Sequence, residues 1–198
     1  LAGPVVSAAV ILKNNIDFGL QPISNRFLES NIEISPSFPL EISWDSKLGC
    51  PVLLKPWPIE EIRPQFDWIT CFEPEDHLDD LCNIILKLKI NKDKATIAGY
   101  SFKDDTTLAR LNKLGFNKQW RIDPKNDLSI LNPLSNIETL QSSFNTLSAN
   151  IIAQKKGLVD VLLVRHVIEH AYDLTDFINA LKLLIKDDGY IVFELPDC

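Results

Sequence analysis

The sequence predicts an α/β fold, a doubly wound parallel sheet preceded by a small β-rich or irregular unit. Residues 159–164 form a nearly unbroken run of apolar, mostly β-branched side chains, which is typical of a strand covered on both faces. An amphipathic helix with Phe177 and Leu181 at helical spacing follows this run. A second apolar run at residues 190–195 comes next. This strand–helix–strand order favours a parallel sheet with helices packed on it.

The segments upstream alternate in the same way. The elements we expect are, in order, a helix at 77–89, a strand at 94–100, a helix at 104–114, a strand at 119–122, a third short strand at 137–140 and a helix at 145–155. Gly115 and Gly157 are the expected helix stops, and residues 186–189, which include Gly189, are expected to end the last helix. The order predicts a doubly wound parallel sheet within residues 75–198.

Residues 1–74 differ in composition from the rest of the chain. Frequent prolines interrupt them, which allows only short strands and turns. Residues 43–44 and 52–54 are candidates for two paired short strands, and residues 60–62 for a helical turn. We therefore expect two domains, a small β-rich unit at 1–74 and an α/β domain at 75–198.

Composition narrows the classes of function. The net charge is −7, from 20 basic and 27 acidic residues, and no Lys/Arg cluster stands out, which argues against a nucleic-acid surface. No apolar run reaches membrane-spanning length, so we expect no membrane partner. The four cysteines form no close pair, which favours reduced thiols in a cytoplasmic protein over a disulfide framework or a metal site. Because the chain starts at Leu1 and lacks methionine, we expect it to be a fragment.

A polar cluster follows the strand at 159–164. Open α/β sheets bind ligands at the carboxyl ends of their strands, where Arg165, His166, Glu169 and His170 are expected. The H-x-x-E-H spacing also occurs in zinc sites, but here it spans a strand–helix transition, so the side chains need not share a face. We predict that His166, Glu169 and His170 line a cofactor and substrate cleft, and that no metal binds.

Three further segments are candidates for contacts with a nucleotide-like cofactor. Gly99, Tyr100 and Ser101 follow the first strand of the α/β part, where a glycine lets the backbone approach a ligand closely. Asp123 ends the second strand, where an acidic side chain accepts hydrogen bonds from ribose hydroxyls. Ser142 follows the third predicted strand, at the position that usually flanks the adenine of such a cofactor. The alternatives are that Gly99 makes only a tight turn and that Asp123 makes only an Asp-Pro turn.

The segment around these candidates resembles a known family. Residues 166–173 (HVIEHAYD) and 186–196 (KDDGYIVFELP) are similar to the fourth strand, fourth helix and fifth strand of class I S-adenosylmethionine-dependent methyltransferases. The resemblance implies a Rossmann-like fold, incomplete at its C-terminus, with S-adenosyl-L-methionine as cofactor. The chain departs from the family at the first loop, where Gly99 is followed by Tyr, Ser, Phe and Lys in place of further glycines.

A second resemblance lies in the N-terminal unit. Residues 20–28 (LQPISNRFL) resemble the G-x-x-P-x-x-N-x-F segment of sugar C-methyltransferases that act on nucleotide-linked deoxysugars. This resemblance implies a substrate-side role for Asn25 and Arg26, to which we add His77 at the start of a predicted helix. The family's zinc-binding cysteine quartet is missing, because only Cys50 falls in the appropriate region, so we predict no zinc. The family's Glu-His base beyond the fifth strand has no counterpart before Cys198.

The two resemblances imply a methyltransferase that forms an enolate beside a sugar keto group and transfers a methyl group to carbon. The acceptor would be a small molecule such as a nucleotide sugar. The alternative is a non-catalytic module, derived from a methyltransferase, that binds S-adenosylmethionine or a nucleotide. A nucleotide-sugar oxidoreductase is disfavoured, because no G-x-G-x-x-G follows the first strand.

Overall fold

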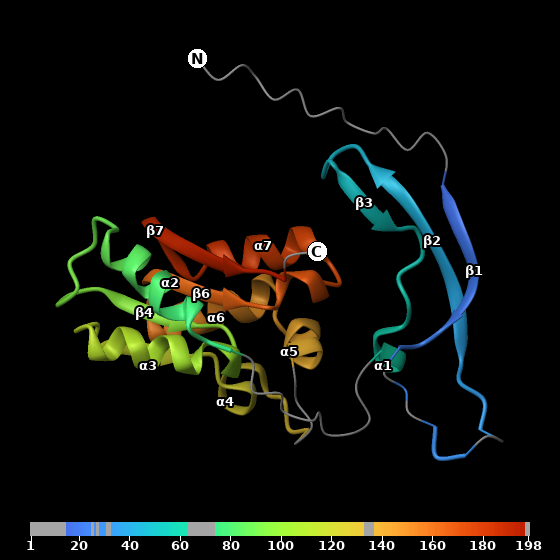
Figure 1. Cartoon of the computed structure of the whole chain (residues 1–198), viewed down its shortest axis with the longest axis horizontal. Coiled ribbons are helices and arrows are strands. Elements are labelled where there is room, and N and C mark those ends of the chain that lie inside the picture. The colour runs from blue at the N-terminus through green and yellow to red at the C-terminus, as the bar shows by residue number, and fades with distance from the viewer. Residues whose placement is uncertain are drawn as a thin grey trace. The chain divides into compact units, whose positions relative to one another are not determined.

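The computed structural model describes residues 15–24, 26, 28–30, 33–62, 74–132 and 137–196, except the side chain of Glu138. The chain divides into two compact units, Leu1–Arg63 and Pro64–Cys198 (Figure 1). Asn25 and residues 64–73 lie outside the described residues. No helix among the described residues is long and apolar enough to cross a membrane.

The N-terminal unit is a three-stranded antiparallel sheet. Strands β1 (Ile16–Pro22), β2 (Ser37–Asp45) and β3 (Cys50–Leu53) follow one another in the sheet, and helix α1 (Ile59–Ile62) comes after them. Ser43 lies opposite Val52, which confirms the predicted pairing of two short strands. The indole Nε1 of Trp57 donates to the carbonyl of Pro39 at 2.9 Å and ties the segment before α1 to β2.

The second unit contains a four-stranded parallel sheet. The strands are β4 (Thr96–Gly99), β5 (Lys118–Arg121), β6 (Val159–Arg165) and β7 (Ile185–Glu194), in the order β5-β4-β6-β7. The helices are α2 (His77–Leu86), α3 (Asp105–Lys113), α4 (Pro124–Leu128), α5 (Ile137–Ser143), α6 (Thr146–Lys156) and α7 (Leu174–Lys182), with short 3-10 turns η1 (Phe102–Asp104) and η2 (Ile168–His170). The coarse prediction of a mixed α/β fold with a parallel sheet is thereby confirmed.

The two central strands, β4 and β6, are buried on both faces, and β6 shows why. Successive side chains of a strand point to opposite faces. Leu162 and Val164 pack with the core that includes residues of α6 and α7, whereas Val161 and Leu163 pack with residues of α2 and α3. The unbroken apolar run therefore reflects helices on both sides of the strand, as the sequence predicted.

Two predicted elements are wrong. The segment expected to be a third strand at 137–140 is the start of helix α5, because Ile137, Leu140 and Phe144 recur at helical spacing and all face the core. The last helix ends at Lys182, and residues 186–189 belong to β7 rather than ending the helix. Lys186 donates to both carboxylate oxygens of Asp160, at 2.9 and 2.8 Å, and so holds this part of β7 against β6.

The strand order creates a switch point at the carboxyl edge of the sheet. From β4 the chain passes through α3 to β5 on one side, while β6 pairs with the other side of β4. The segments that follow β4 and β6 therefore leave the sheet at adjacent positions. Such a point is where open α/β sheets bind their ligands.

Candidate functional site

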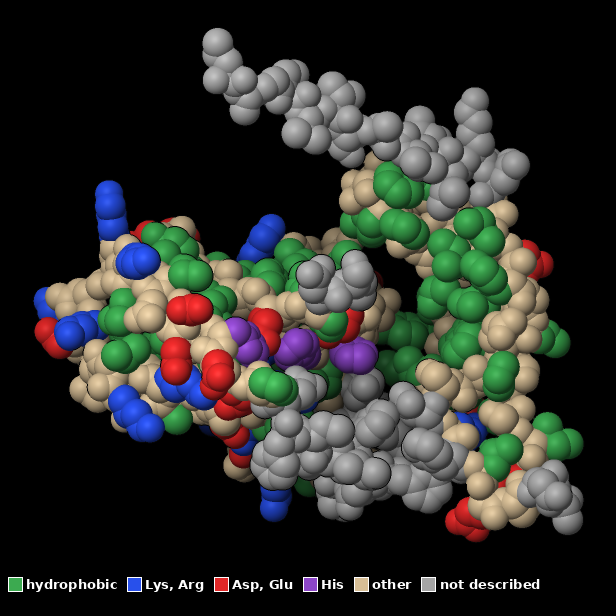
Figure 2. Space-filling model, in the orientation of Figure 1, with side chains coloured by type: hydrophobic (Ala, Val, Ile, Leu, Met, Phe, Trp, Pro, Cys, Tyr) green, Lys and Arg blue, Asp and Glu red, His purple; other side chains and the backbone are tan. Residues whose placement is uncertain are grey.

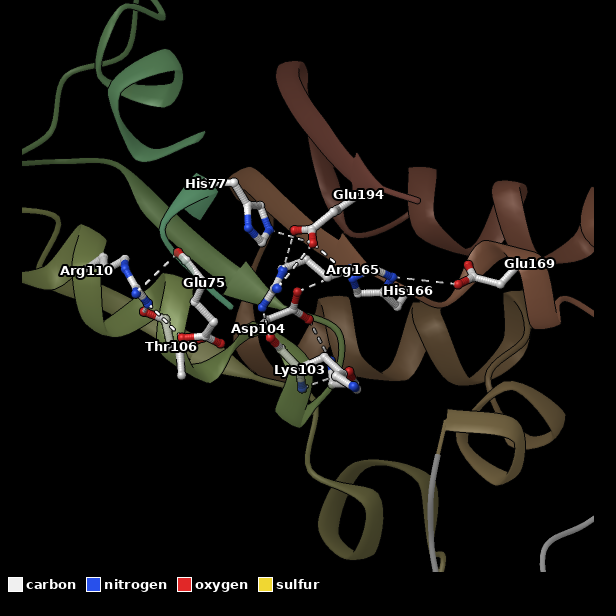
Figure 3. Close-up of polar contacts among 11 residues, drawn as sticks. Glu75, His77, Lys103, Asp104, Thr106, Arg110, Arg165, His166, Glu169 and Glu194 are labelled. Carbon is white, nitrogen blue, oxygen red and sulfur yellow. Dashed lines mark hydrogen bonds and ion pairs between the residues drawn. The ribbon is translucent and has the colours of Figure 1, made fainter. Parts of the chain in front are cut away.

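A network of charged side chains surrounds Glu194 at the carboxyl edge of the sheet (Figure 3). Glu194 ends β7, and the parallel register places it beside Arg165 at the end of β6. Arg165 Nε contacts Glu194 Oε2 at 2.5 Å, and its Nη2 contacts Oε1 at 3.2 Å. Its Nη1 donates to the carbonyl oxygen of Lys103 in η1, so Arg165 joins the segments that follow β4 and β6.

Two histidines contact the same carboxylate oxygen. His77 Nε2 lies 3.0 Å from Glu194 Oε1, and His166 Nε2 lies 2.9 Å from it. His77 comes from the start of α2, and His166 follows β6 directly. The three histidines of the chain lie in a row on one face of the α/β unit (Figure 2). His166 has a φ of 49°, a left-handed conformation that is unusual for a residue with a side chain.

The surroundings of Glu194 keep it ionised. Partial burial opposes the charged form, but hydrogen bonds from Arg165 and His77 outweigh it and lower the pKa of Glu194 to about 2. At neutral pH the group is therefore a carboxylate that can only accept hydrogen bonds. Both histidine contacts must then be made by protonated Nε2 atoms.

Asp104 is a buried carboxyl next to this network. Burial raises the pKa of Asp104 to about 7, although its oxygens accept the backbone N–H groups of Ser101 at 2.9 Å and Arg165 at 3.3 Å. The same carboxyl closes a capping box with Ser101 at the start of η1. Asp104 therefore ties the loop after β4 to the end of β6.

The loop after β4 packs into the protein. Tyr100 and Ser101 are buried, and Tyr100 makes edge-to-face contacts with Phe144 and Phe177, with ring centroids 5.1 and 5.6 Å apart. A Cβ on Gly99 would come within 2.8 Å of the Cβ of Asp104, so glycine is required here by close packing. The predicted cofactor residues Gly99, Tyr100 and Ser101 thus serve the fold of this loop.

The buried hydroxyl of Tyr100 gives a direct test of this packing. Within the described part of the chain, the hydroxyl has no hydrogen-bond partner. Because an unpaired buried hydroxyl costs about 1–3 kcal/mol, Tyr100→Phe is expected to leave the free energy of unfolding unchanged or to raise it by about 1 kcal/mol. Urea unfolding followed by circular dichroism measures this, with Tyr190→Phe on β7, an exposed tyrosine, as the control. A loss of 1 kcal/mol or more in the first variant alone would show that the hydroxyl is hydrogen-bonded in solution.

The remaining predicted cofactor residues lie on neighbouring elements. Asp123 follows β5 and caps α4, where its Oδ1 accepts the N–H of Asn126 at 2.6 Å. Ile122, just before it, donates its N–H to the carbonyl of Gly99 at 3.0 Å, so the segments after β4 and β5 are adjacent. Ser142 lies in α5 and donates its hydroxyl to the carbonyl of Thr139 at 2.8 Å.

The predicted substrate residues separate into two groups. Arg26 belongs to the N-terminal unit, where its Nη1 pairs with Glu61 Oε2 at 3.0 Å, a structural contact next to α1. His77 and Glu169 join the network, since Glu169 Oε1 lies 3.9 Å from His166 Nδ1. His170 ends η2, in the same segment after β6.

Sequence reasoning missed Glu194 and Asp104 as members of the site. It placed Arg165 in the polar cluster but did not predict its ion pair with Glu194. A signal for this pair was present, because Arg165 and Glu194 are the charged residues that close two apolar strands. Charged side chains at the carboxyl ends of neighbouring parallel strands meet at one edge of the sheet. Among the described residues, no group of three or more His, Cys, Asp or Glu side chains is arranged to hold a metal ion.

Comparison with known proteins does not assign the chain to a family. No protein-family model matches the sequence. A search of curated proteins finds no match either. The functional proposal therefore rests on the site and on the resemblances in the sequence.

Proposed function

We propose that the α/β unit is the catalytic domain of an S-adenosylmethionine-dependent methyltransferase. The acceptor would be a nucleotide-linked keto-deoxysugar or a related small molecule, methylated at carbon through an enolate. The observation that carries the proposal is the switch point between β4 and β6, where His166 and Arg165 follow one strand and the Gly99 loop follows the other. This is the edge at which the sequence resemblance expects the cofactor.

The residues around this edge fit the cofactor in part. One oxygen of Asp123 caps α4, which leaves Oδ2 to accept a ribose hydroxyl. Phe102 is exposed in the loop after β4 and could cover an adenine ring. The N–H groups of Tyr100 and Ser101 are already paired, with the carbonyl of Leu163 and with Asp104, so the loop has fewer free donors than a glycine-rich loop. The cofactor would supply the methyl group, and the chain's own residues would position the acceptor.

The closed loop favours a second candidate function. Side chains pack closely at the switch point. Tyr100 and Ser101 are buried there, and Arg165 is hydrogen-bonded to the carbonyl of Lys103. A non-catalytic module that binds S-adenosylmethionine or a nucleotide would need no access for an acceptor. This candidate predicts ligand binding without methyl transfer.

The test is isothermal titration of the chain with S-adenosylhomocysteine. We expect micromolar binding, which Asp123→Asn weakens by about tenfold or more, because a hydrogen bond to a carboxylate contributes about 1.5–3 kcal/mol. Asparagine is as good a helix cap as aspartate, so the variant removes the charge and keeps α4 capped. Gly99 is a poor position for this test, since any side chain there meets Asp104.

Asp188→Asn is the matched control, because Asp188 is exposed on β7 and the variant makes the same chemical change. Its affinity should equal that of the unaltered chain. A folded chain that shows no binding at millimolar ligand would rule out the methyltransferase proposal. If Asp123→Asn bound S-adenosylhomocysteine as tightly as the unaltered chain, Asp123 would not be the residue that binds the ribose.

A further inference from the structure

The carboxylate of Glu194 has more partners than its charge requires. Arg165 contacts both oxygens through the two arms of its guanidinium, a bidentate arrangement that balances the charge. His77 and His166 then add two more contacts to Oε1 alone. A pairing that only held β6 and β7 together would need neither ring.

The carboxylate determines the tautomer of both rings. Because an ionised carboxylate only accepts, each neutral imidazole must carry its proton on Nε2 and its lone pair on Nδ1. The side chain of His77 is 54% exposed, so solvent or a ligand can reach the ring. The side chain of His166 is 22% exposed, and its Nδ1 lies 3.9 Å from Glu169 Oε1, so a second carboxylate flanks this ring.

The cluster is located where a substrate would meet it. Glu194 and His166 lie at the carboxyl ends of β7 and β6, the edge of a parallel sheet that binds ligands. His166 is held in a left-handed backbone conformation, a kind of strain that clusters at functional sites. Glu194 is 117 residues from His77, so the contact is made only in the folded chain.

We infer that His77, oriented by Glu194, takes a proton from an acidic C–H group of the acceptor, next to a carbonyl. In this step the C–H bond breaks, its electron pair stays on the acceptor as an enolate, and the proton forms a bond to Nδ1 of His77. The imidazolium shares its Nε2 proton with Glu194 and later releases the Nδ1 proton to water. Glu194 is the positioning residue. The inference rests on the proposed function, because that function supplies an acceptor of this class.

The first test is independent of any ligand. Long-range proton–nitrogen NMR of the ¹⁵N-labelled full chain should show His77 and His166 with the proton on Nε2 at mildly alkaline pH. In Glu194→Gln the His77 ring should become a mixture of tautomers, whereas in Asp188→Asn it should keep one. A His77 proton on Nδ1 in the unaltered chain would overturn the inference. This measurement does not depend on whether Glu194→Gln folds. An unchanged His77 tautomer in folded Glu194→Gln would also overturn it.

The second test measures the proton transfer itself. The full chain is incubated in D₂O with S-adenosylhomocysteine and a nucleoside-diphosphate-linked keto-deoxysugar, and deuterium gained beside the keto group is measured by mass spectrometry. We expect exchange by the unaltered chain and exchange at least about 100-fold slower in His77→Gln, since general-base catalysis contributes about 100- to 10,000-fold. Glutamine keeps an N–H for Glu194 and cannot take the proton.

The outcomes separate this inference from the proposed function. Exchange that survives in His77→Gln, or no exchange by a chain that binds S-adenosylhomocysteine, would overturn the inference and leave the cofactor assignment in place. Failure to bind S-adenosylhomocysteine, with exchange that depends on His77, would overturn the methyltransferase proposal alone. Exchange lost in His77→Gln and kept in Asp188→Asn would support the assignment of the proton acceptor.

Discussion

Arg165→Met is expected to lower the free energy of unfolding of the α/β unit by about 3–5 kcal/mol, the usual cost of removing one partner from a buried ion pair. The side chain of Arg165 is 5% exposed and that of Glu194 is 16% exposed, so water can replace the lost contacts only in part. The carbonyl of Lys103 loses its donor at the same time. Urea unfolding followed by circular dichroism measures the change.

The matched control is Arg121→Met. Arg121 Nε pairs with Asp105 Oδ1 at 3.0 Å, but these side chains are more accessible, at 33% and 53% exposure. Exposed pairs contribute about 1 kcal/mol or less. If the two variants lost the same small amount, the Arg165–Glu194 pair would contribute no more than a surface pair, and the network would not hold β6 to β7.

Asp104→Asn should change the pH dependence of stability. The folded pKa of Asp104, about 7, is above its ordinary value of 3.8, so the folded chain keeps a proton that the unfolded chain has already released. Between about pH 4 and pH 7 the folded state therefore binds more protons, and its stability falls as the pH rises. The shift corresponds to a loss on the order of 4 kcal/mol across this window. Asparagine does not titrate, so the variant should lack this loss.

The measurement is urea unfolding of both chains at a series of pH values, plotted as the difference in free energy of unfolding. This difference should favour the variant increasingly from about pH 4 to pH 7. Glu194 acts in a separate window, because its folded pKa of about 2 is below the ordinary 4.5, so its contribution is complete above about pH 4.5 and is lost as the pH falls toward 2. Parallel curves for the two chains between pH 4 and 7 would show that Asp104 is ionised throughout.

Local pattern was sufficient to predict much of the α/β unit. The apolar run predicted β6, and the periodic apolar face predicted α7. A strand buried on both faces has apolar residues in succession, whereas a helix buried on one side has them three or four residues apart. Residues 137–140 were predicted wrongly because so short an apolar segment fits a strand and a helix equally well. The core decided for helix α5, since Ile137 and Leu140, three residues apart, both pack in the core that holds Tyr100. A helix directs such a pair to one side, whereas a strand would direct it to opposite faces.

The candidate site divides in the same way. The sequence alone determined that His166 and Glu169 follow a buried strand, because a strand and the turn after it are neighbours along the chain. It also determined that Asp123 follows β5. Only the tertiary structure decided that His77 would share the carboxylate of Glu194 with Arg165 and His166. Hydrophobic periodicity reports which side of an element is buried, whereas a hydrogen bond between residues 117 positions apart depends on strand order and register, which no local spacing encodes.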